Sequence, residues 1–268
     1  MSGPLSRRYI VITRPREHCA GIAERIRAAG GEPVIFPAIE ILPPENTSAL
    51  DRVIDELDEF HLAIFISQTA AAKGHGAVIA RRAWPKGMRV AAVGAGTASS
   101  LKALGFDAVI APRGQADSEA LAALPEMQEL RGKAVVIFRG EGGREWLRAA
   151  LETRGARVEY AECYRRARPA ADLAPLIARW RKNEIDAVSI TSGEGLKNFF
   201  DLLDAEGQDY LRATPVFVPH PRVAETASAL GILQLVVTGS GDEQTIAEMA
   251  AFFAKVRLHM ESRTDAGK

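Results

Sequence analysis

Residues 157–169 read RVEYAECYRRARP, and the interpretation of the whole chain depends on this stretch. Strand alternation, with Val158, Tyr160 and Tyr164 as its large side chains, carries it to about residue 166, and Pro169 then forces an extended exit. A complete strand–helix unit precedes it, and a different polar helix follows it. We therefore interpret the stretch as a crossing between two lobes, with Tyr164 near a cleft. An ordinary strand with a half-buried tyrosine would explain the same pattern.

The composition is that of an ordinary soluble protein. A chain of 268 residues suits one large or two modest domains, and 47% hydrophobic and 25% charged residues are usual values. Lys+Arg and Asp+Glu balance at 34 each, so no net charge directs the chain to nucleic acid or to a membrane. No apolar run is long enough to span a bilayer, and the N-terminus lacks the features of a signal peptide. We therefore expect a cytoplasmic protein.

Cysteine and histidine usage argues against redox and metal chemistry. The two cysteines, Cys19 and Cys163, form no paired motif, and a cytoplasmic chain keeps them reduced. Cys163 is interpreted as a small hydrophobic strand residue and not as a nucleophile. The five histidines show no metal-ligand spacing. We therefore expect no metal site.

One three-part strand–helix module occurs twice along the chain. Its first part is strand–Arg–loop–helix–Gly–strand, its second is strand–Ser–helix, and its third is strand–loop–helix–Leu-Gly–strand. The three parts occur in turn at residues 9–37 and 134–162, 62–72 and 187–199, and 89–112 and 214–238. Matches in the same order favour two similar parallel-sheet lobes over convergent patterning.

Candidate binding residues follow from the expected strand ends. In parallel α/β sheets, ligands bind beyond the carboxyl ends of the strands, where helix N-termini offer unpaired N–H groups. These positions, which extend to Pro219 and Ser240, are rich in Ser, Thr, Gly and Arg and contain no acidic pair and no Ser-His-Asp set. They predict anion binding and not acyl transfer or metal hydrolysis. The candidates are Arg14, Ser67, Gly96, Thr97, Ser118, Arg139, Gly140, Thr191, Ser192 and Arg222.

Each candidate also has a purely structural explanation. Ser67, Thr97 and Ser192 suit helix N-caps, a role worth about 1 kcal/mol that needs no ligand, and Ser118 is placed to cap a short helix within residues 115–124. The arginines suit solvated charges. The segment VGAGTAS has two of the three glycines of a dinucleotide fingerprint, and RGEGGRE lacks the Lys-Ser/Thr pair of a P-loop, so nucleotide binding is disfavoured.

Six segments in this order resemble the uroporphyrinogen-III synthase family: VITRP, IFIS, VGAGTASSLKALG, RGEGGREWLRAALETRGARVEYAECYRR, ITSGEGLKNFF and PHPRVAETASALG. The resemblance covers nearly the whole chain. It implies two doubly wound, Rossmann- or flavodoxin-like parallel-sheet lobes joined by a two-stranded connector, with the site in the cleft between them. One lobe would comprise residues 1–38 and 168–268, the other residues 39–167, with a hinge near 37–41 and 164–169. Residues 257–268 are expected to form a flexible tail.

The resemblance also implies a substrate and a reaction. Hydroxymethylbilane, a linear tetrapyrrole carrying acetate and propionate groups, would lose water and close through a spiro intermediate to uroporphyrinogen III, with ring D inverted and without a cofactor or metal. Tyr164 matches the family's functional tyrosine, a candidate general acid for the departing hydroxyl. Ser67, Thr97, Thr191 and Ser192 match positions that line the family's cleft.

The chain departs from the family at the second strand end. Ile66 stands where relatives commonly have Thr, and Gln68-Thr69 where they often have Asn, which puts local substrate contacts in question. The family pattern favours a monomer, with a transient contact to hydroxymethylbilane synthase as a further hypothesis. A non-catalytic, two-lobed anion- or tetrapyrrole-binding sensor is the alternative function, although such sensors usually carry an effector segment and we identify none here.

Overall fold

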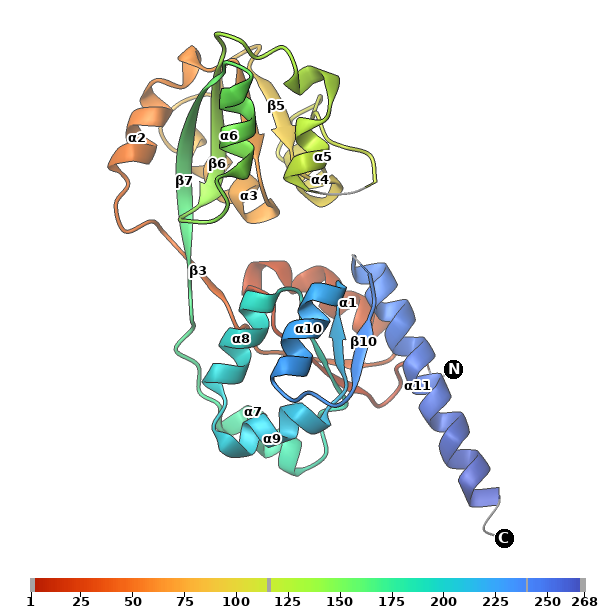
Figure 1. The fold of residues 1–268 in the computed structure, drawn as a ribbon. Coiled ribbons are helices and arrows are strands. Elements are labelled where there is room, and N and C mark those ends of the chain that lie inside the picture. The colour runs from red at the N-terminus through yellow and green to blue at the C-terminus, as the bar shows by residue number, and fades with distance from the viewer. Residues whose placement is uncertain (1–2, 115–116, 240, 266–268) are drawn as a thin grey trace. The chain divides into compact units, whose positions relative to one another are not determined.

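The chain folds into two compact units. Unit 1 comprises residues 1–40 and 167–268, and unit 2 comprises residues 41–166. The lobes implied by the family resemblance were residues 1–38 with 168–268 and residues 39–167. The structure, a computed structural model, describes residues 3–114, 117–239 and 241–265 (Figure 1).

Unit 1 is built on a five-stranded parallel sheet with the order β10-β9-β8-β1-β2. Its strands are β1 (Tyr9–Ile12), β2 (Glu32–Ile35), β8 (Ala187–Ser189), β9 (Val216–Val218) and β10 (Leu235–Val237). Alternate side chains of β1 enter different cores, Ile10 and Ile12 on one face and Val11 on the other. One face is covered by α1 (Ala20–Ala28) and α11 (Asp242–Asp265), the other by α7 (Ala174–Arg181), α8 (Gly193–Leu202), α9 (Ala205–Ala213) and α10 (Pro221–Ala229).

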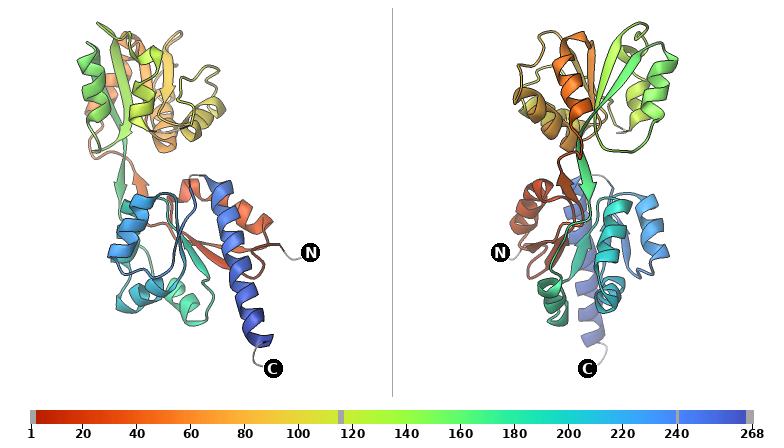
Figure 2. Two further views of the ribbon diagram at one scale, coloured as in Figure 1. Left: turned by 45° about the vertical axis from the view of Figure 1, so that its right-hand side comes forward. Right: turned by 90° about the vertical axis from the view of Figure 1, so that its left-hand side faces the viewer.

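Unit 2 is built on a second five-stranded sheet, with the order β3-β7-β6-β4-β5. Its strands are β3 (Glu40–Leu42), β4 (Leu62–Phe65), β5 (Arg89–Ala92), β6 (Ala134–Gly140) and β7 (Arg157–Ala167). One face is covered by α2 (Ser48–Asp55), α3 (Gln68–Ile79) and α4 (Ala95–Ala103), the other by α5 (Ser118–Ala122) and α6 (Trp146–Thr153). Helices on both faces of each sheet are visible in Figure 2, which confirms the expected doubly wound architecture.

The sheet orders agree with the predicted repeat. The first module part forms β1-α1-β2 and β6-α6-β7, the second forms β4-α3 and β8-α8, and the third forms β5-α4 and β9-α10-β10. Equivalent strands take equivalent places, because β2-β1-β8-β9 in one sheet corresponds to β7-β6-β4-β5 in the other. Each unit therefore combines the first part of one copy with the second and third parts of the other copy.

The two crossings between the units use neighbouring strands. The chain leaves unit 1 within β3 and returns at the end of β7, and these two strands are adjacent in the unit 2 sheet. This arrangement agrees with the expected two-stranded connector. The hinge proposed for these crossings stays a prediction.

Three sequence expectations differ from the structure. Residues 107–112 form no strand, only an isolated bridge between Ile110 and Ala91, because the segment lies at the sheet edge and Pro112 has no N–H to extend the ladder. Helix α9 was not expected from the sequence. Asp204 is its N-cap, and the Asp204 side chain accepts a hydrogen bond from Gly207 N at 2.8 Å. Helix α11 continues past residue 256 to Asp265, and the flexibility of residues 257–268 remains untested.

No helix among residues 3–114, 117–239 and 241–265 combines the length and the hydropathy needed to cross a bilayer.

Two glycines of α3 provide a matched test of packing in unit 2. A Cβ on Gly74 would lie 2.5 Å from Cδ1 of Phe138, a fully buried ring that stacks on Phe65, whereas a Cβ on Gly76 would meet nothing within 4 Å. Both substitutions to Ala gain the same helix propensity. The difference between their free energies of unfolding therefore measures the cost of overpacking alone. We expect Gly74→Ala to be less stable than Gly76→Ala by about 1–3 kcal/mol in urea unfolding. Equal stabilities would show that the core yields to the extra methyl group.

Candidate functional site

In each sheet the order of strand addition reverses between two neighbouring strands, so that the connecting helices before and after this point cover opposite faces of the sheet. This switch point lies between β4 and β6 in unit 2 and between β1 and β8 in unit 1. Open α/β sheets bind ligands beyond the carboxyl ends of such strands. Ser67 and Arg139 lie at this place in unit 2, and Arg14 and Ser192 lie at the equivalent place in unit 1. Some of the predicted strand-end candidates therefore flank both switch points, whereas Gly96, Thr97 and Arg222 follow β5 and β9.

A bulge in β7 determines where Tyr164 points. Arg139 pairs with Glu162 and the next residue, Gly140, pairs with Tyr164, so Cys163 is the extra residue on β7. Without this shift, alternation would place Tyr164 on the same face as Glu162. With it, Tyr164 joins the core that contains Cys163, and only 3% of the tyrosine is exposed.

Tyr164 and Ser67 meet at the carboxyl edge of unit 2. Their hydroxyl oxygens are 3.2 Å apart, and either hydroxyl has the geometry to donate. Ser67 Oγ also accepts a hydrogen bond from Ala70 N at 3.0 Å, so Ser67 caps α3 as expected and contacts the tyrosine as well. Gly140 leaves room for the ring, because a Cβ there would lie 2.7 Å from Cε2 and Cζ of Tyr164.

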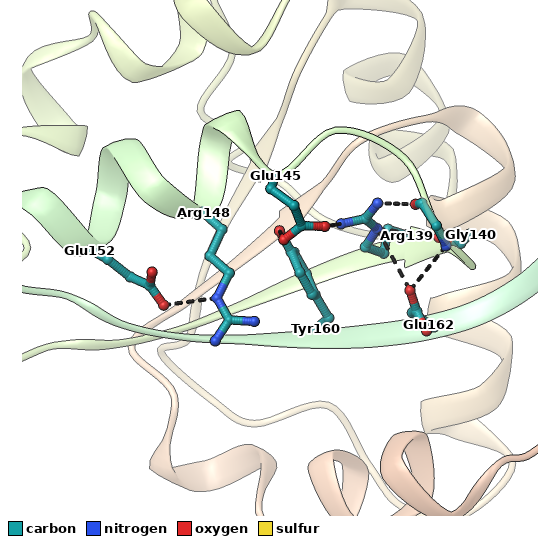
Figure 3. A network of polar contacts seen from close by, with 8 residues as sticks. Arg139, Gly140, Glu145, Arg148, Glu152, Tyr160 and Glu162 are labelled. Atoms are coloured by element: carbon teal, nitrogen blue, oxygen red, sulfur yellow. Dashed lines mark hydrogen bonds and ion pairs between the residues drawn. The ribbon is translucent and has the colours of Figure 1, made fainter.

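Arg139 is not a solvated charge, since only 2% of it is exposed. Its Nε donates to the Gly140 carbonyl at 3.2 Å, Nη1 donates to Glu145 Oε1 at 3.1 Å, and Nη2 donates to the Gly142 carbonyl (Figure 3). The guanidinium also lies 4.3 Å from the ring centroid of Tyr160. Arg139 thus stabilises the conformation of the loop that follows β6.

Tyr160 and Glu145 are functional candidates that the sequence analysis did not select. Tyr160 Oη donates to Glu145 Oε2 at 2.8 Å, and the ring has Arg139 on one side and Arg148 on the other (Figure 3). Burial, followed by the hydrogen bond to Glu145, raises the pKa of Tyr160 to about 12. The same hydrogen bond is the main reason why the pKa of Glu145 is lowered.

The raised pKa of Tyr160 predicts a loss of stability in alkali. An unfolded tyrosine ionises near pH 10, whereas folded Tyr160 stays neutral to about pH 12, so its contribution is present below pH 10 and is lost between about pH 10 and 12. We expect the tyrosinate absorbance difference between wild type and Tyr160→Phe to titrate near pH 12. A midpoint near the ordinary value of about 10 would contradict the burial of this hydroxyl.

A pocket of about 440 Å³ opens beside this network, wholly within unit 2. Its apolar part is formed by Ile66, Val93, Ile137 and Leu147. Its polar part is formed by Asp117, Ser118, Arg139, Gly143, Arg144, Tyr160 and Arg166. The arginine-rich lining makes the pocket suitable for an organic anion with an apolar body.

This pocket contains only some of the predicted residues. Ser118 and Arg139 line it, but Tyr164 does not. A larger hollow of about 740 Å³ lies along residues 107–111, and none of the predicted residues lines it.

Two predicted caps are wrong. The N-cap of α5 is Asp117, which accepts from Ala120 N at 2.7 Å, so Ser118 is the first helical residue. The N-cap of α4 is Gly94, and Thr97 is a buried residue inside that helix. The neighbouring Gly96 lies against the start of α3, since a Cβ there would come within 2.5 Å of Gln68 Nε2.

At the carboxyl edge of unit 1, most hydroxyls are engaged within the protein. Ser192 caps α8 by accepting from Gly195 N at 3.0 Å, as expected, and Thr13 Oγ1 donates to the Ser189 carbonyl at 2.8 Å. Thr191 is exposed beside them. Backbone donors and arginines are therefore the main groups of this edge with the chemistry to bind an anion.

The two arginines of this edge differ in their surroundings. Arg14 Nη1 donates to Asp242 Oδ1 at 2.8 Å, and the Arg14 side chain is 15% exposed. Arg222 is exposed at the start of α10, where its backbone N donates to Nδ1 of His220. Ser240 lies outside the described residues.

The remaining predictions concern metals and Cys163. No group of three or more metal-ligating side chains occurs within the described ranges. Cys163 Sγ donates to the carbonyl of Arg139 at 3.3 Å, and burial raises its pKa to about 12. A thiol of this kind is unreactive at neutral pH, in agreement with its interpretation as a small hydrophobic residue.

The fold and the strand ends together define a class. The protein has two flavodoxin-like α/β units, and their carboxyl edges carry hydroxyls, backbone donors and arginines that suit a polyanion. A family model described as uroporphyrinogen-III synthase HemD matches residues 20–249.

Known proteins of the same description are similar over most of the chain. The uroporphyrinogen-III synthase of Salmonella typhimurium is 34% identical over 241 residues, which cover 88% of this chain and 97% of that protein. The Escherichia coli enzyme is 31% identical over 239 residues, with the same coverage of 88% and 97%. The chain therefore belongs to the uroporphyrinogen-III synthase family, and it is an enzyme of tetrapyrrole biosynthesis.

Solved structures support the fold. A mutant uroporphyrinogen III synthase from Thermus thermophilus aligns with a TM-score of 0.59 at 16% identity, covering 92% of this chain and 99% of that one. The Helicobacter pylori uroporphyrinogen-III synthetase aligns with a TM-score of 0.59 at 14% identity, covering 91% and 99%.

Proposed function

We propose that the chain cyclises hydroxymethylbilane to uroporphyrinogen III with inversion of ring D. Family membership supports the reaction, and the observation that carries the assignment of residues is the contact between the Tyr164 and Ser67 hydroxyls at the switch point of unit 2. The C–O bond of the hydroxymethyl group breaks and the oxygen leaves as water. The resulting azafulvene cation is attacked by the substituted carbon of ring D, and the spiro intermediate fragments and closes again with loss of a proton.

Tyr164 supplies the proton to the departing hydroxyl in this proposal. A phenol O–H is a proton donor of the kind that general acid catalysis uses. For its proton to point toward substrate, its oxygen must accept the hydrogen bond from Ser67 Oγ. Ser67 is fixed for this task because its oxygen already accepts from Ala70 N. Ser67 is thus the positioning residue, and Tyr164 is the proposed catalytic residue.

The arginine-lined pocket of unit 2 holds carboxylates of the bilane. Arg144 and Arg166 line it beside Ser118, and Arg139 fixes the loop that carries Arg144. At the carboxyl edge of unit 1 the exposed candidates Thr191 and Arg222 supply further polar contacts, whereas Thr97 of unit 2 is buried and Ser192 Oγ caps α8. Holding a flexible polyanion in one conformation favours the inverting closure over spontaneous closure, a contribution that needs no redox group.

The state of the protein in the cell is a separate part of the proposal. We infer a cytoplasmic monomer, the state that the family pattern favours. A transient contact with hydroxymethylbilane synthase would shorten the time in which free bilane closes spontaneously.

The proposed function predicts both binding and turnover. Hydroxymethylbilane generated in situ should disappear faster with the protein than without it, and the rate should saturate with bilane. Uroporphyrinogen should raise the unfolding temperature. Stabilisation without faster bilane consumption would instead support a non-catalytic tetrapyrrole-binding protein, and the absence of both would contradict the proposal.

A further inference from the structure

The two copies of the module place an arginine at equivalent strand ends, but the two arginines differ in how they are held. Arg139 is bound by two carbonyls of its own loop and by Glu145. Arg14 has a single described ion pair, with Asp242, and its Nε is buried without a hydrogen-bond partner. The Arg14 guanidinium is therefore held less completely than that of Arg139, and Asp242 is its one described carboxylate partner.

The surroundings of Asp242 favour breaking of its ion pair with Arg14. It is the first residue of α11, its side chain is 27% exposed, and it follows Gly241, whose φ is 107°. Releasing Arg14 would return this carboxylate to water at little cost, because it is already partly solvated. The ion pair joins residues at opposite ends of unit 1 in the sequence, yet both lie at the carboxyl edge of its sheet.

We propose that Asp242 is an internal carboxylate that occupies Arg14 in the free enzyme and is displaced by a carboxylate of the substrate. This inference rests on the proposed function. Because one carboxylate replaces another, the exchange is nearly balanced for a single anion. It becomes favourable only for a ligand that makes further contacts elsewhere. Asp242 therefore excludes small monocarboxylates from Arg14 and admits a polycarboxylate.

The first test compares two substitutions in the same helical turn. Asp242→Asn removes the competing charge, and we expect the KM for hydroxymethylbilane to fall about twofold to fivefold, the range of a partly exposed ion pair. Glu243→Gln removes the same charge from an exposed neighbour, and we expect KM to stay near the wild-type value. An equal fall in both variants would show a general effect of charge and would overturn the proposal, as would an unchanged or raised KM in Asp242→Asn.

The second test asks whether the effect passes through Arg14. In an Arg14→Gln background, KM should rise and the Asp242→Asn substitution should no longer lower it. An undiminished effect of Asp242→Asn without Arg14 would contradict the competition. Acetate should inhibit Asp242→Asn but not wild type, since the freed guanidinium accepts a monocarboxylate.

A binding measurement separates this inference from the proposed function. Calorimetric affinity for uroporphyrinogen should increase in Asp242→Asn by the same factor as KM falls. If wild type fails to consume bilane, the proposed function is wrong. If wild type is active and Asp242→Asn does not bind more tightly, only this inference is wrong. Unfolding curves would show whether α11 stays folded, and Asp242→Ser, a second uncharged replacement, repeats the test if Asn destabilises the helix.

Discussion

We expect Tyr164→Phe to lower kcat by about 100-fold and to change KM by less than about threefold, because a general acid acts only in the transition state. The substitution removes one hydroxyl whose single described partner is Ser67, at 3.2 Å. The ring stays in its core, so the free energy of unfolding should fall by no more than about 1 kcal/mol. Steady-state kinetics with saturating bilane, together with urea unfolding, measure both effects.

Ser67→Ala is the matched control for this prediction. It removes the other hydroxyl of the pair and the cap of α3, at a cost of about 1 kcal/mol, but leaves the phenol in place. Its kcat should therefore fall much less than that of Tyr164→Phe. Full turnover by Tyr164→Phe would remove the acid role from this tyrosine.

Gly140→Ala should have the second large effect. The new Cβ would lie 2.7 Å from two ring carbons of Tyr164. Neither side yields easily, because β6 is paired between β4 and β7 and the tyrosine is only 3% exposed. We expect a loss of about 1–3 kcal/mol in stability from overpacking. Displacement of the hydroxyl should lower kcat at least about tenfold, since proton transfer depends on its position.

A double-mutant cycle identifies the source of that loss. In a Tyr164→Ala background, the ring is absent and Gly140→Ala should cost little stability. Urea unfolding of the four proteins gives the interaction energy. The same cost in both backgrounds would mean that strand β6, and not the tyrosine ring, is disturbed.

Much of the fold was predictable because its signals are local. Buried strands such as residues 62–65 appear as apolar runs, and an Arg or Ser at the ends of β1, β4, β6 and β8 marks the start of the next loop or cap. The repetition of these signals predicted two similar sheets, whereas the exchange of the first part between the two units was expected only from the family resemblance. Residues 107–112 show the limit of prediction from local pattern. The same apolar pattern formed only a single bridge there, because no further strand paired with the segment.

The site was less predictable because it depends on register and on distant contacts. The sequence pointed to Tyr164, but only the bulge at Cys163 places its hydroxyl beside Ser67. Ser67 and Ser192 were predicted as caps from sequence, whereas Asp117 took the place expected for Ser118 because its carboxylate reaches Ala120 N. No local signal marks such a choice between adjacent residues.

Long-range ion pairs were invisible to sequence reasoning. Arg14 and Asp242 are 228 positions apart, and Tyr160 and Glu145 meet only because β7 lies beside the loop that ends at α6. Arg139 was expected to be solvated or to bind substrate, and it instead fastens its own loop. Charged residues at strand ends therefore need the folded structure before a role can be assigned.

The central claim is that this chain inverts ring D during cyclisation. The most direct measurement generates hydroxymethylbilane in situ, adds the protein, oxidises the product and separates the uroporphyrin isomers by chromatography. The protein should change the product from mainly type I, the isomer of spontaneous closure, to mainly type III. A product that remains mainly type I in the presence of folded protein would contradict it.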